Sequence, residues 1–211
     1  MTVRVGVLVS GSGTNLQALL DAISDMEGAE VGVVISNKQS AYGLERARKA
    51  SVPDIFIDHR GKSRASFDSE IVECLRKHRV EWVALAGFMR LITPVFLDAF
   101  PGRIINIHPS LLPSFPGIDA QQQAFDAGVR LAGATVHFVN GGTDAGPIIA
   151  QGVVQRLPDD SVDELRARIL KVEHQLYPMV LRWAVEGRLE LADEGVRVRL
   201  LEGESQSLFG N

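Results

Sequence analysis

Cysteine is almost absent from this 211-residue chain. The single Cys74 cannot form an internal disulfide, so no disulfide framework stabilises the fold. Phe67, Ile71 and Leu75 lie at helical spacing around it. We therefore interpret Cys74 as a small core residue on the apolar side of a helix, rather than as a reactive thiol.

Long apolar runs are missing too. No stretch approaches the roughly 20 apolar residues that a membrane-crossing helix needs. The N-terminus carries one arginine and then a strand-like segment, which is unlike a secretory signal. We expect a cytoplasmic protein with no membrane partner.

Dense charge of either sign is also lacking. The formal net charge is -4 and no five like charges follow one another. Proteins that bind nucleic acid need clustered Lys and Arg against the phosphate backbone, so a nucleic-acid partner is not expected. With 45% hydrophobic residues and no visible linker or repeat, one compact domain is the default.

Short β-rich segments alternate with helical segments along most of the chain, a pattern typical of α/β proteins. The spacing predicts strands over 3–9, 31–35, 54–57, 81–86, 104–107, 133–139 and 148–155. It predicts helices over 16–23, 41–50, 66–78, 93–100 and 119–127, and a long one from a capping box at Ser161–Glu164. The C-terminus predicts a hairpin around Glu194-Gly195 and a frayed tail from Gly203.

A glycine turn links the first strand to the first helix, with the sequence Ser10-Gly11-Ser12-Gly13-Thr14-Asn15. Glycines allow a close approach to an anion, and a helix N-terminus offers free N–H groups. The third glycine of the dinucleotide fingerprint is replaced by Leu16, and no acid follows the second strand. This pattern favours a mononucleotide-type phosphate over NAD, although a plain tight turn would look the same.

Polar groups also end the strand at 104–107. Asn106 and His108 are two residues apart, so they share one face of the strand, where they place an amide donor beside a titratable base. Prolines 109, 113 and 116 then predict a rigid, partly buried loop. Ligands of open α/β sheets bind beyond the carboxyl ends of strands, so this is a candidate reaction centre.

Three further polar groups have an open interpretation. Arg90, among large apolar residues, could meet the acid of a flat ligand or could simply snorkel from the core. Asp144 projects from a glycine-rich turn that is either a ligand-lining loop or a hairpin. His137 fits a hydrogen-bonded structural histidine better than a catalytic one, and no short spacing suggests a zinc site.

Taken together, these motifs resemble those of the glycinamide ribonucleotide transformylases, the folate-dependent formyltransferases of purine biosynthesis. The matching segments are Val7–Leu19, Ile35–Lys38, Gly43–Ala47 (G-L-E-R-A), Leu85–Arg90, Asn106–Gly117 (N-I-H-P-S-L-L-P-S-F-P-G), Thr135–Val139, Asp144–Ile149 and Glu173–Pro178. After Gly117 the chain reads I-D-A-Q-Q-Q where relatives often carry histidines, and Leu170 stands where some relatives have a basic residue.

The resemblance implies a Rossmann-like formyltransferase fold, with a mostly parallel central sheet flanked by helices on both faces. It implies one formyltransferase domain over 1–186, with a nucleotide-binding half to about residue 100 and a folate-binding half over 101–186. Residues 187–211 would form a C-terminal hairpin and tail. The implied reaction moves the formyl group of 10-formyltetrahydrofolate to glycinamide ribonucleotide, without a metal, in a monomer or homodimer.

The resemblance also assigns roles to individual residues. It implies that Asn106, His108 and Asp144 are catalytic and that Gly11, Ser12, Gly13, Thr14 and Asn15 hold the substrate phosphate. Gly87, Pro109 and Glu173 would contact the ribose and glycinamide part. The implied folate contacts are Arg64, Met89, Arg90, Leu91, Ile92, Asn140, Gly141 and Thr143.

Other functions share parts of this pattern. A 10-formyltetrahydrofolate hydrolase normally carries an additional N-terminal regulatory domain, and a methionyl-tRNA formyltransferase a C-terminal tRNA-binding domain. The chain starts directly at its first strand and has no basic surface signal, so we expect neither. A noncatalytic nucleotide-binding module would keep its role without Asn106, His108 and Asp144.

Overall fold

The computed structural model describes residues 2–192 and 195–210, which divide into two compact units, Met1–Asn106 and Ile107–Asn211. The first unit contains the strands β1 (Val3–Val9), β2 (Ala29–Ser36), β3 (Asp54–Phe56), β4 (Trp82–Leu85) and most of β5 (Ile104–His108). Its helices are α1 (Thr14–Ile23), α2 (Tyr42–Lys49), α3 (Arg64–Lys77) and α4 (Pro94–Ala99).

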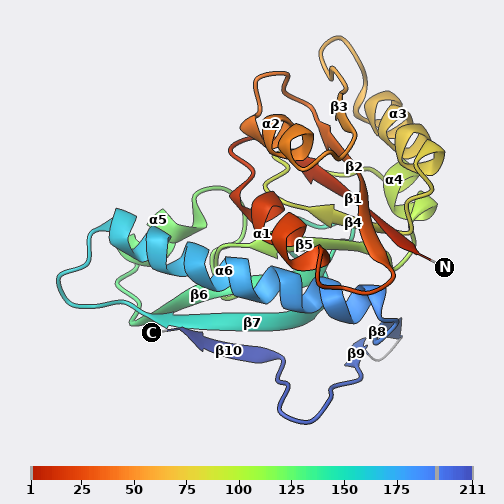
Figure 1. The fold of residues 1–211 in the computed structure, drawn as a ribbon. Coiled ribbons are helices and arrows are strands. Elements are labelled where there is room, and N and C mark those ends of the chain that lie inside the picture. The colour runs from red at the N-terminus through yellow and green to blue at the C-terminus, as the bar shows by residue number, and fades with distance from the viewer. Residues whose placement is uncertain (1, 193–194, 211) are drawn as a thin grey trace. The chain divides into compact units, whose positions relative to one another are not determined.

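The five strands of the first unit are parallel and lie in the order β5-β4-β1-β2-β3. The chain moves outward from β1 through β2 to β3 and then returns through β4 to β5. Right-handed crossovers place helices on opposite faces when this direction reverses. Accordingly, α1 and α2 lie on one side of the strands, and α3 and α4 on the other (Figure 1).

β1 is the centre of this unit because its apolar run is buried on both faces. Val5, Val7, Leu8 and Val9 are almost fully shielded from solvent, as expected for a central strand of a parallel sheet. β1 and β4 are parallel neighbours, and the order in which strands are added to the sheet reverses between them. Such a switch point leaves a crevice at the carboxyl ends of the strands, where α/β proteins bind their ligands.

The second unit contains α5 (Ala120–Asp126), β6 (Leu131–Phe138), β7 (Ile148–Gln155), the long helix α6 (Val162–Val185), the hairpin strands β8 (Leu189–Ala192) and β9 (Gly195–Val198), and β10 (Ser207–Gly210). β6 and β7 are antiparallel, β10 pairs in parallel with β7, and α6 packs across these strands (Figure 1). The predicted capping box forms, with Ser161 and Glu164 bonding each other's backbone N–H.

The frayed C-terminal tail is the prediction that the structure contradicts. Residues 207–210 form β10, and two contacts hold the segment before it. The buried Arg188 guanidinium donates to the Glu204 carboxylate at 2.6 Å, and Gln206 Nε2 donates to the Ile149 carbonyl at 2.7 Å. The predicted hairpin is present as β8 and β9, although Glu194 of its turn lies outside the described residues.

Candidate active site

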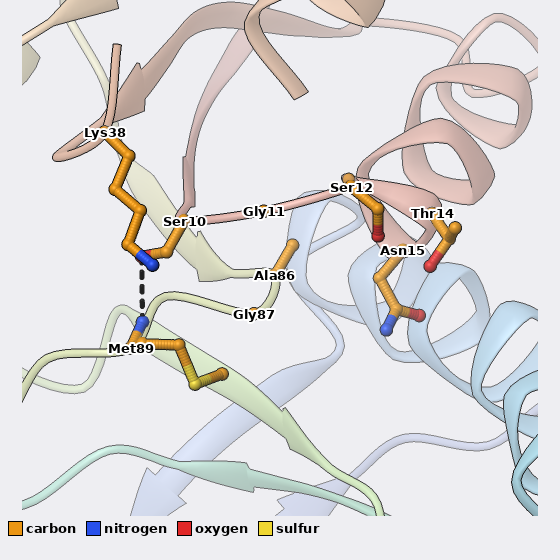
Figure 2. Close-up of a pocket in the computed structure, with 10 residues that line it drawn as sticks. Ser10, Gly11, Ser12, Thr14, Asn15, Lys38, Ala86, Gly87 and Met89 are labelled. Atoms are coloured by element: carbon orange, nitrogen blue, oxygen red, sulfur yellow. Dashed lines mark hydrogen bonds between the residues drawn. The ribbon is translucent and has the colours of Figure 1, made fainter. Parts of the chain in front are cut away.

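A pocket of about 330 Å³ opens at the carboxyl ends of β1 and β4, at the switch point of the first unit. Its lining comes from three segments: the glycine loop after β1, the end of β2, and the loop after β4 (Figure 2). The lining residues are Ser10, Gly11, Ser12, Gly13, Thr14, Asn15, Lys38, Ala86, Gly87 and Met89. All five predicted phosphate-loop residues therefore share one cavity with the predicted Gly87 and Met89.

The glycine loop ends at Gly13, which precedes α1 with φ of +70°. Only glycine adopts this left-handed backbone without strain. No side chain caps the helix at Gly13. The first N–H groups of an α-helix have no carbonyl partner within the helix, and at the positive end of its dipole they form an anion site.

Ser10 connects the three pocket-lining segments. Its hydroxyl donates to Asn37 Oδ1 at 2.6 Å and accepts from the Met89 N–H at 2.9 Å, the dashed line in Figure 2. Its own N–H donates to the Gly87 carbonyl at 3.1 Å. These buried bonds fix the loop after β4 against the ends of β1 and β2.

Lys38 is the one charged residue among the described residues that line the pocket. Its side chain extends toward Ser10 and Met89 (Figure 2). Lysine is common on surfaces, so only its position after a strand end distinguishes Lys38 in the sequence. Ser10 was named in the glycine turn but given no role of its own, and Ala86 was missed. Their roles depend on strands that meet only in the folded sheet.

The second unit brings together two of the three residues expected to be catalytic. His108 Nδ1 lies 3.3 Å from Asp144 Oδ2, and both side chains are largely buried. His108 Nε2 lies 2.9 Å from the Phe115 carbonyl, which can only accept. Nε2 can therefore donate to this carbonyl, and Nδ1 is the ring nitrogen that faces the Asp144 carboxylate.

Backbone strain surrounds this pair. Phe115 and Asp144 adopt φ of +56° and +49°, a region that non-glycine residues rarely occupy. The Gly117 N–H also donates to Asp144 Oδ2, at 2.8 Å. Strained residues held by several bonds are concentrated at functional sites, which favours a functional role for this pair.

The loop 109–117 is anchored to β6 as well. Thr135 Oγ1 donates to the Ser110 carbonyl at 2.7 Å and accepts from the Leu112 N–H at 3.0 Å. Ser110 Oγ donates to the Ser114 carbonyl at 2.6 Å. These bonds hold the carbonyl of Phe115 in place against His108, in agreement with the rigid, partly buried loop that the prolines predicted.

His137 is also close to Asp144, with 3.8 Å between Nε2 and Oδ1. Its Nδ1 donates to the Phe138 carbonyl at 2.8 Å, which fixes the tautomer. Burial lowers the pKa of His137, so the ring is neutral and Nε2 carries a lone pair. His137 thus forms part of the surroundings of Asp144, beyond the local structural role that its sequence context favoured.

The remaining predicted residues lie in several places. Asn106 is half-buried on the same face of β5 as His108, and Pro109 follows directly. Glu173 is buried on α6. In the turn after β6, Gly141 and Thr143 are exposed, whereas Asn140 bonds the Gly142 N–H and the Ala145 carbonyl.

The predicted folate contacts of the first unit lie outside the pocket, except for Met89. Arg64 is exposed at the start of α3, and one turn later the ring of Phe67 lies 4.8 Å from the Arg90 guanidinium. Arg90 is therefore packed on an aromatic face yet still able to donate. Leu91 is exposed and Ile92 is half-buried.

Within the described residues, no group of three His, Cys, Asp or Glu side chains could hold a metal ion. Over the same residues, no helix is long and apolar enough to span a membrane.

Comparison with known proteins decides the family. The formyl transferase family model matches residues 3–181. The phosphoribosylglycinamide formyltransferase of Haemophilus influenzae is 43% identical over 192 residues, which cover 90% of this chain and 91% of that protein. The chain belongs to the phosphoribosylglycinamide formyltransferase family. The predicted enzyme class and purine-biosynthesis setting are confirmed at this level.

Solved structures of this family agree. Glycinamide ribonucleotide transformylase 1 of Symbiobacterium toebii is 51% identical with a TM-score of 0.90, covering 93% of this chain and 94% of that one. The phosphoribosylglycinamide formyltransferase of Anaplasma phagocytophilum has a TM-score of 0.91 at 40% identity, over 99% of both chains. The predicted fold class is therefore confirmed.

A similar sequence occurs as part of a larger protein. The trifunctional purine biosynthetic protein adenosine-3 of Drosophila melanogaster is 47% identical over 195 residues, which span 14% of its length.

Proposed function

We propose that this chain transfers the formyl group of 10-formyltetrahydrofolate to the amine of glycinamide ribonucleotide, giving formylglycinamide ribonucleotide and tetrahydrofolate. The observation that carries this proposal is the contact of 3.3 Å between His108 and Asp144, a base beside an acid, in a chain of the phosphoribosylglycinamide formyltransferase family. The substrates are small molecules, and formyl-folate acts as a cosubstrate that leaves as tetrahydrofolate.

The reaction needs a donor for developing negative charge. The amine nitrogen of the acceptor forms a bond to the formyl carbon, which places charge on the formyl oxygen. Asn106 and His108 lie on one face of β5. The Asn106 amide would donate to such an oxygen, and His108 Nε2 would do so by exchanging the Phe115 carbonyl for the formyl oxygen when the substrates bind. Losing one such donor typically raises the barrier by about 3 to 4 kcal/mol.

The reaction also needs a carrier for one proton. The bond between the formyl carbon and the folate nitrogen breaks, and the proton that the amine loses must end on that nitrogen. Asp144 would hold that proton in transit, because Oδ2 lies 3.3 Å from His108 Nδ1 and Oδ1 faces the lone pair of His137. General acid–base catalysis by such a group contributes about 10² to 10⁴-fold.

Substrate binding is divided among the other residues. The phosphate would bind in the pocket of the first unit, where the glycine-loop amides and Lys38 supply donors and positive charge. The glutamate end of the folate would meet Arg64 and Arg90, and Met89 to Ile92 with Asn140, Gly141 and Thr143 would enclose the pterin. Gly87, Pro109 and Glu173 would contact the ribose and glycinamide part.

The test is a spectrophotometric assay with a formyl-folate analogue, run with and without glycinamide ribonucleotide. The proposal predicts deformylation that depends on the acceptor. Deformylation at the same rate without acceptor would instead indicate a hydrolase, and none under either condition would favour a nucleotide-binding module. His108→Ala should leave ribonucleotide binding within a few-fold while the rate collapses.

A further inference from the structure

The segment G-L-E-R-A, Gly43 to Ala47, has no role in the proposed function. It forms the start of α2, and neither Gly43 nor Arg46 is among the described residues that line the pocket. Two of its residues nevertheless contact the glycine loop. The helix therefore supports the loop from the side that faces away from the pocket.

Both contacts are made to carbonyl groups of the loop. The Gly43 N–H donates to the Gly11 carbonyl at 3.1 Å. Arg46 Nε donates to the Ser12 carbonyl at 2.8 Å, while Nη1 donates to Gln17 Oε1 at 3.1 Å. Arg46 thus bonds the loop and the first turn of α1 at once, through two donors that the planar guanidinium holds in a fixed fork.

Peptide geometry converts these contacts into an orientation of donors. In a planar trans peptide, the C=O of one residue and the N–H of the next point in opposite directions. Fixing the Gly11 and Ser12 carbonyls toward α2 therefore turns the N–H groups of Ser12 and Gly13 away from it. Neither N–H donates to an acceptor within the part of the chain that the structure describes.

Close packing leaves the loop little freedom to turn over. A Cβ on Gly13 would lie 2.7 Å from Gly43 Cα, and a Cβ on Gly43 would lie 2.8 Å from Val9 Cγ2. The Arg46 guanidinium is also held, because it lies 5.0 Å from the centre of the Tyr42 ring. We call the contacts of Gly43 and Arg46 with the glycine loop the clamp. In it, backbone packs against backbone, and Arg46 supplies the side-chain contact.

We propose that Arg46 is a positioning residue for the phosphate site, which acts through the glycine loop by fixing two peptide groups with their N–H donors toward the anion. Gly43 makes the matching contact and allows the helix to approach. The identity of the anion as the ribonucleotide phosphate rests on the proposed function, whereas the contacts of the clamp do not.

Arg46→Met tests the proposal because it removes the donors and keeps the aliphatic stem. The KM for glycinamide ribonucleotide should rise about tenfold, the effect of one lost charge-assisted hydrogen bond. The kcat and the KM for formyl-folate should stay within about twofold of wild type, since Arg46 bonds the glycine loop and none of the residues proposed to be catalytic. Arg48→Met is the matched control, because Arg48 is exposed on the same helix and pairs with Glu45 and Asp54.

Glycinamide ribonucleoside, which lacks the phosphate, separates this role from general damage to the fold. Arg46→Met should leave the KM for this nucleoside unchanged. An equal rise for nucleoside and ribonucleotide, or no rise for either, would overturn the proposal. Arg46→Lys keeps the charge but loses the planar fork of donors, so its KM for the ribonucleotide should also rise. A wild-type KM in this variant would show that charge alone matters and would overturn the proposal.

Ribose 5-phosphate distinguishes failure of the clamp from failure of the proposed function. If the wild-type protein formylates no glycinamide ribonucleotide, the proposed function fails, and the dissociation constant of ribose 5-phosphate still tests the clamp. A constant about tenfold higher in Arg46→Met than in Arg48→Met supports the clamp. Equal constants in the two variants overturn it.

Discussion

Replacing Asp144 by asparagine removes the carboxylate that faces His108 Nδ1 and keeps the shape of the side chain. The Phe115 carbonyl still accepts from His108 Nε2. An amide at position 144 carries no negative charge to oppose positive charge on the ring. The variant should therefore stabilise a charged His108 ring less well during the reaction, which makes the ring a weaker donor to a developing oxyanion.

The size of the effect follows from the contact. Two unit charges 3.3 Å apart attract by roughly 5 kcal/mol at an effective dielectric constant of about 20. Desolvation of two largely buried groups offsets part of this attraction. A net increase of about 3 kcal/mol in the barrier is in the range measured for a lost oxyanion donor, and it corresponds to a roughly 100-fold lower kcat.

The assay is steady-state deformylation of a formyl-folate analogue at saturating glycinamide ribonucleotide. Asp159→Asn is the control, because Asp159 is exposed in the same unit and its loss changes the net charge equally. Circular dichroism and urea unfolding should show that both variants are folded. A kcat for Asp144→Asn within about threefold of wild type would refute the reasoning from the His108–Asp144 contact.

Three further predictions concern binding and stability. Lys38→Met should raise the KM for the ribonucleotide about fivefold at low ionic strength, because an exposed ion pair is worth about 1 kcal/mol. The increase in KM should be much smaller at about 1 M salt, and a salt-independent change would contradict an electrostatic role. Burial lowers the pKa of His137 from 6.5, so as the pH falls below 6.5 the unfolded state gains a proton first and wild-type stability decreases by up to about 1.4 kcal/mol per pH unit. In urea unfolding, His137→Asn should show a shallower decrease, and equal slopes would contradict the neutral buried ring. The Arg188 hydrogen bond lowers the pKa of Glu204 to about 2, so this carboxylate stabilises the fold above its ordinary value of 4.5 and loses that effect as the pH falls toward 2. Glu204→Gln should lower the melting temperature at neutral pH but not near pH 2, and an equal loss at both pH values would argue against the ion pair.

Local signals explain what the sequence predicted well. The glycine loop after β1 and the capping box of α6 are each defined by a few consecutive residues, and both form as expected. Asn106 and His108 share a face of β5 because strand geometry requires it. The prediction that Asp144 acts together with His108 rested on the family resemblance, because no local pattern relates two residues so far apart in the chain.

Long-range and backbone contacts explain what the sequence could not predict. The acceptor for His108 Nε2 is the backbone carbonyl of Phe115. Every residue carries a carbonyl, so no sequence pattern identifies this one. The short segment Ser207–Gly210 becomes ordered only because β7 offers it an edge and the Arg188–Glu204 pair anchors the chain before it. No local pattern distinguishes Arg46 from a surface charge, because its contact with the Ser12 carbonyl forms only in the fold.

The central claim is that the formyl group moves to an amine and not to water. The most direct measurement follows a ¹³C-labelled formyl group from the folate by NMR in the presence of glycinamide ribonucleotide. The account predicts one labelled formylglycinamide ribonucleotide for each tetrahydrofolate formed. Labelled formate as the main product, with the ribonucleotide unchanged, would contradict it.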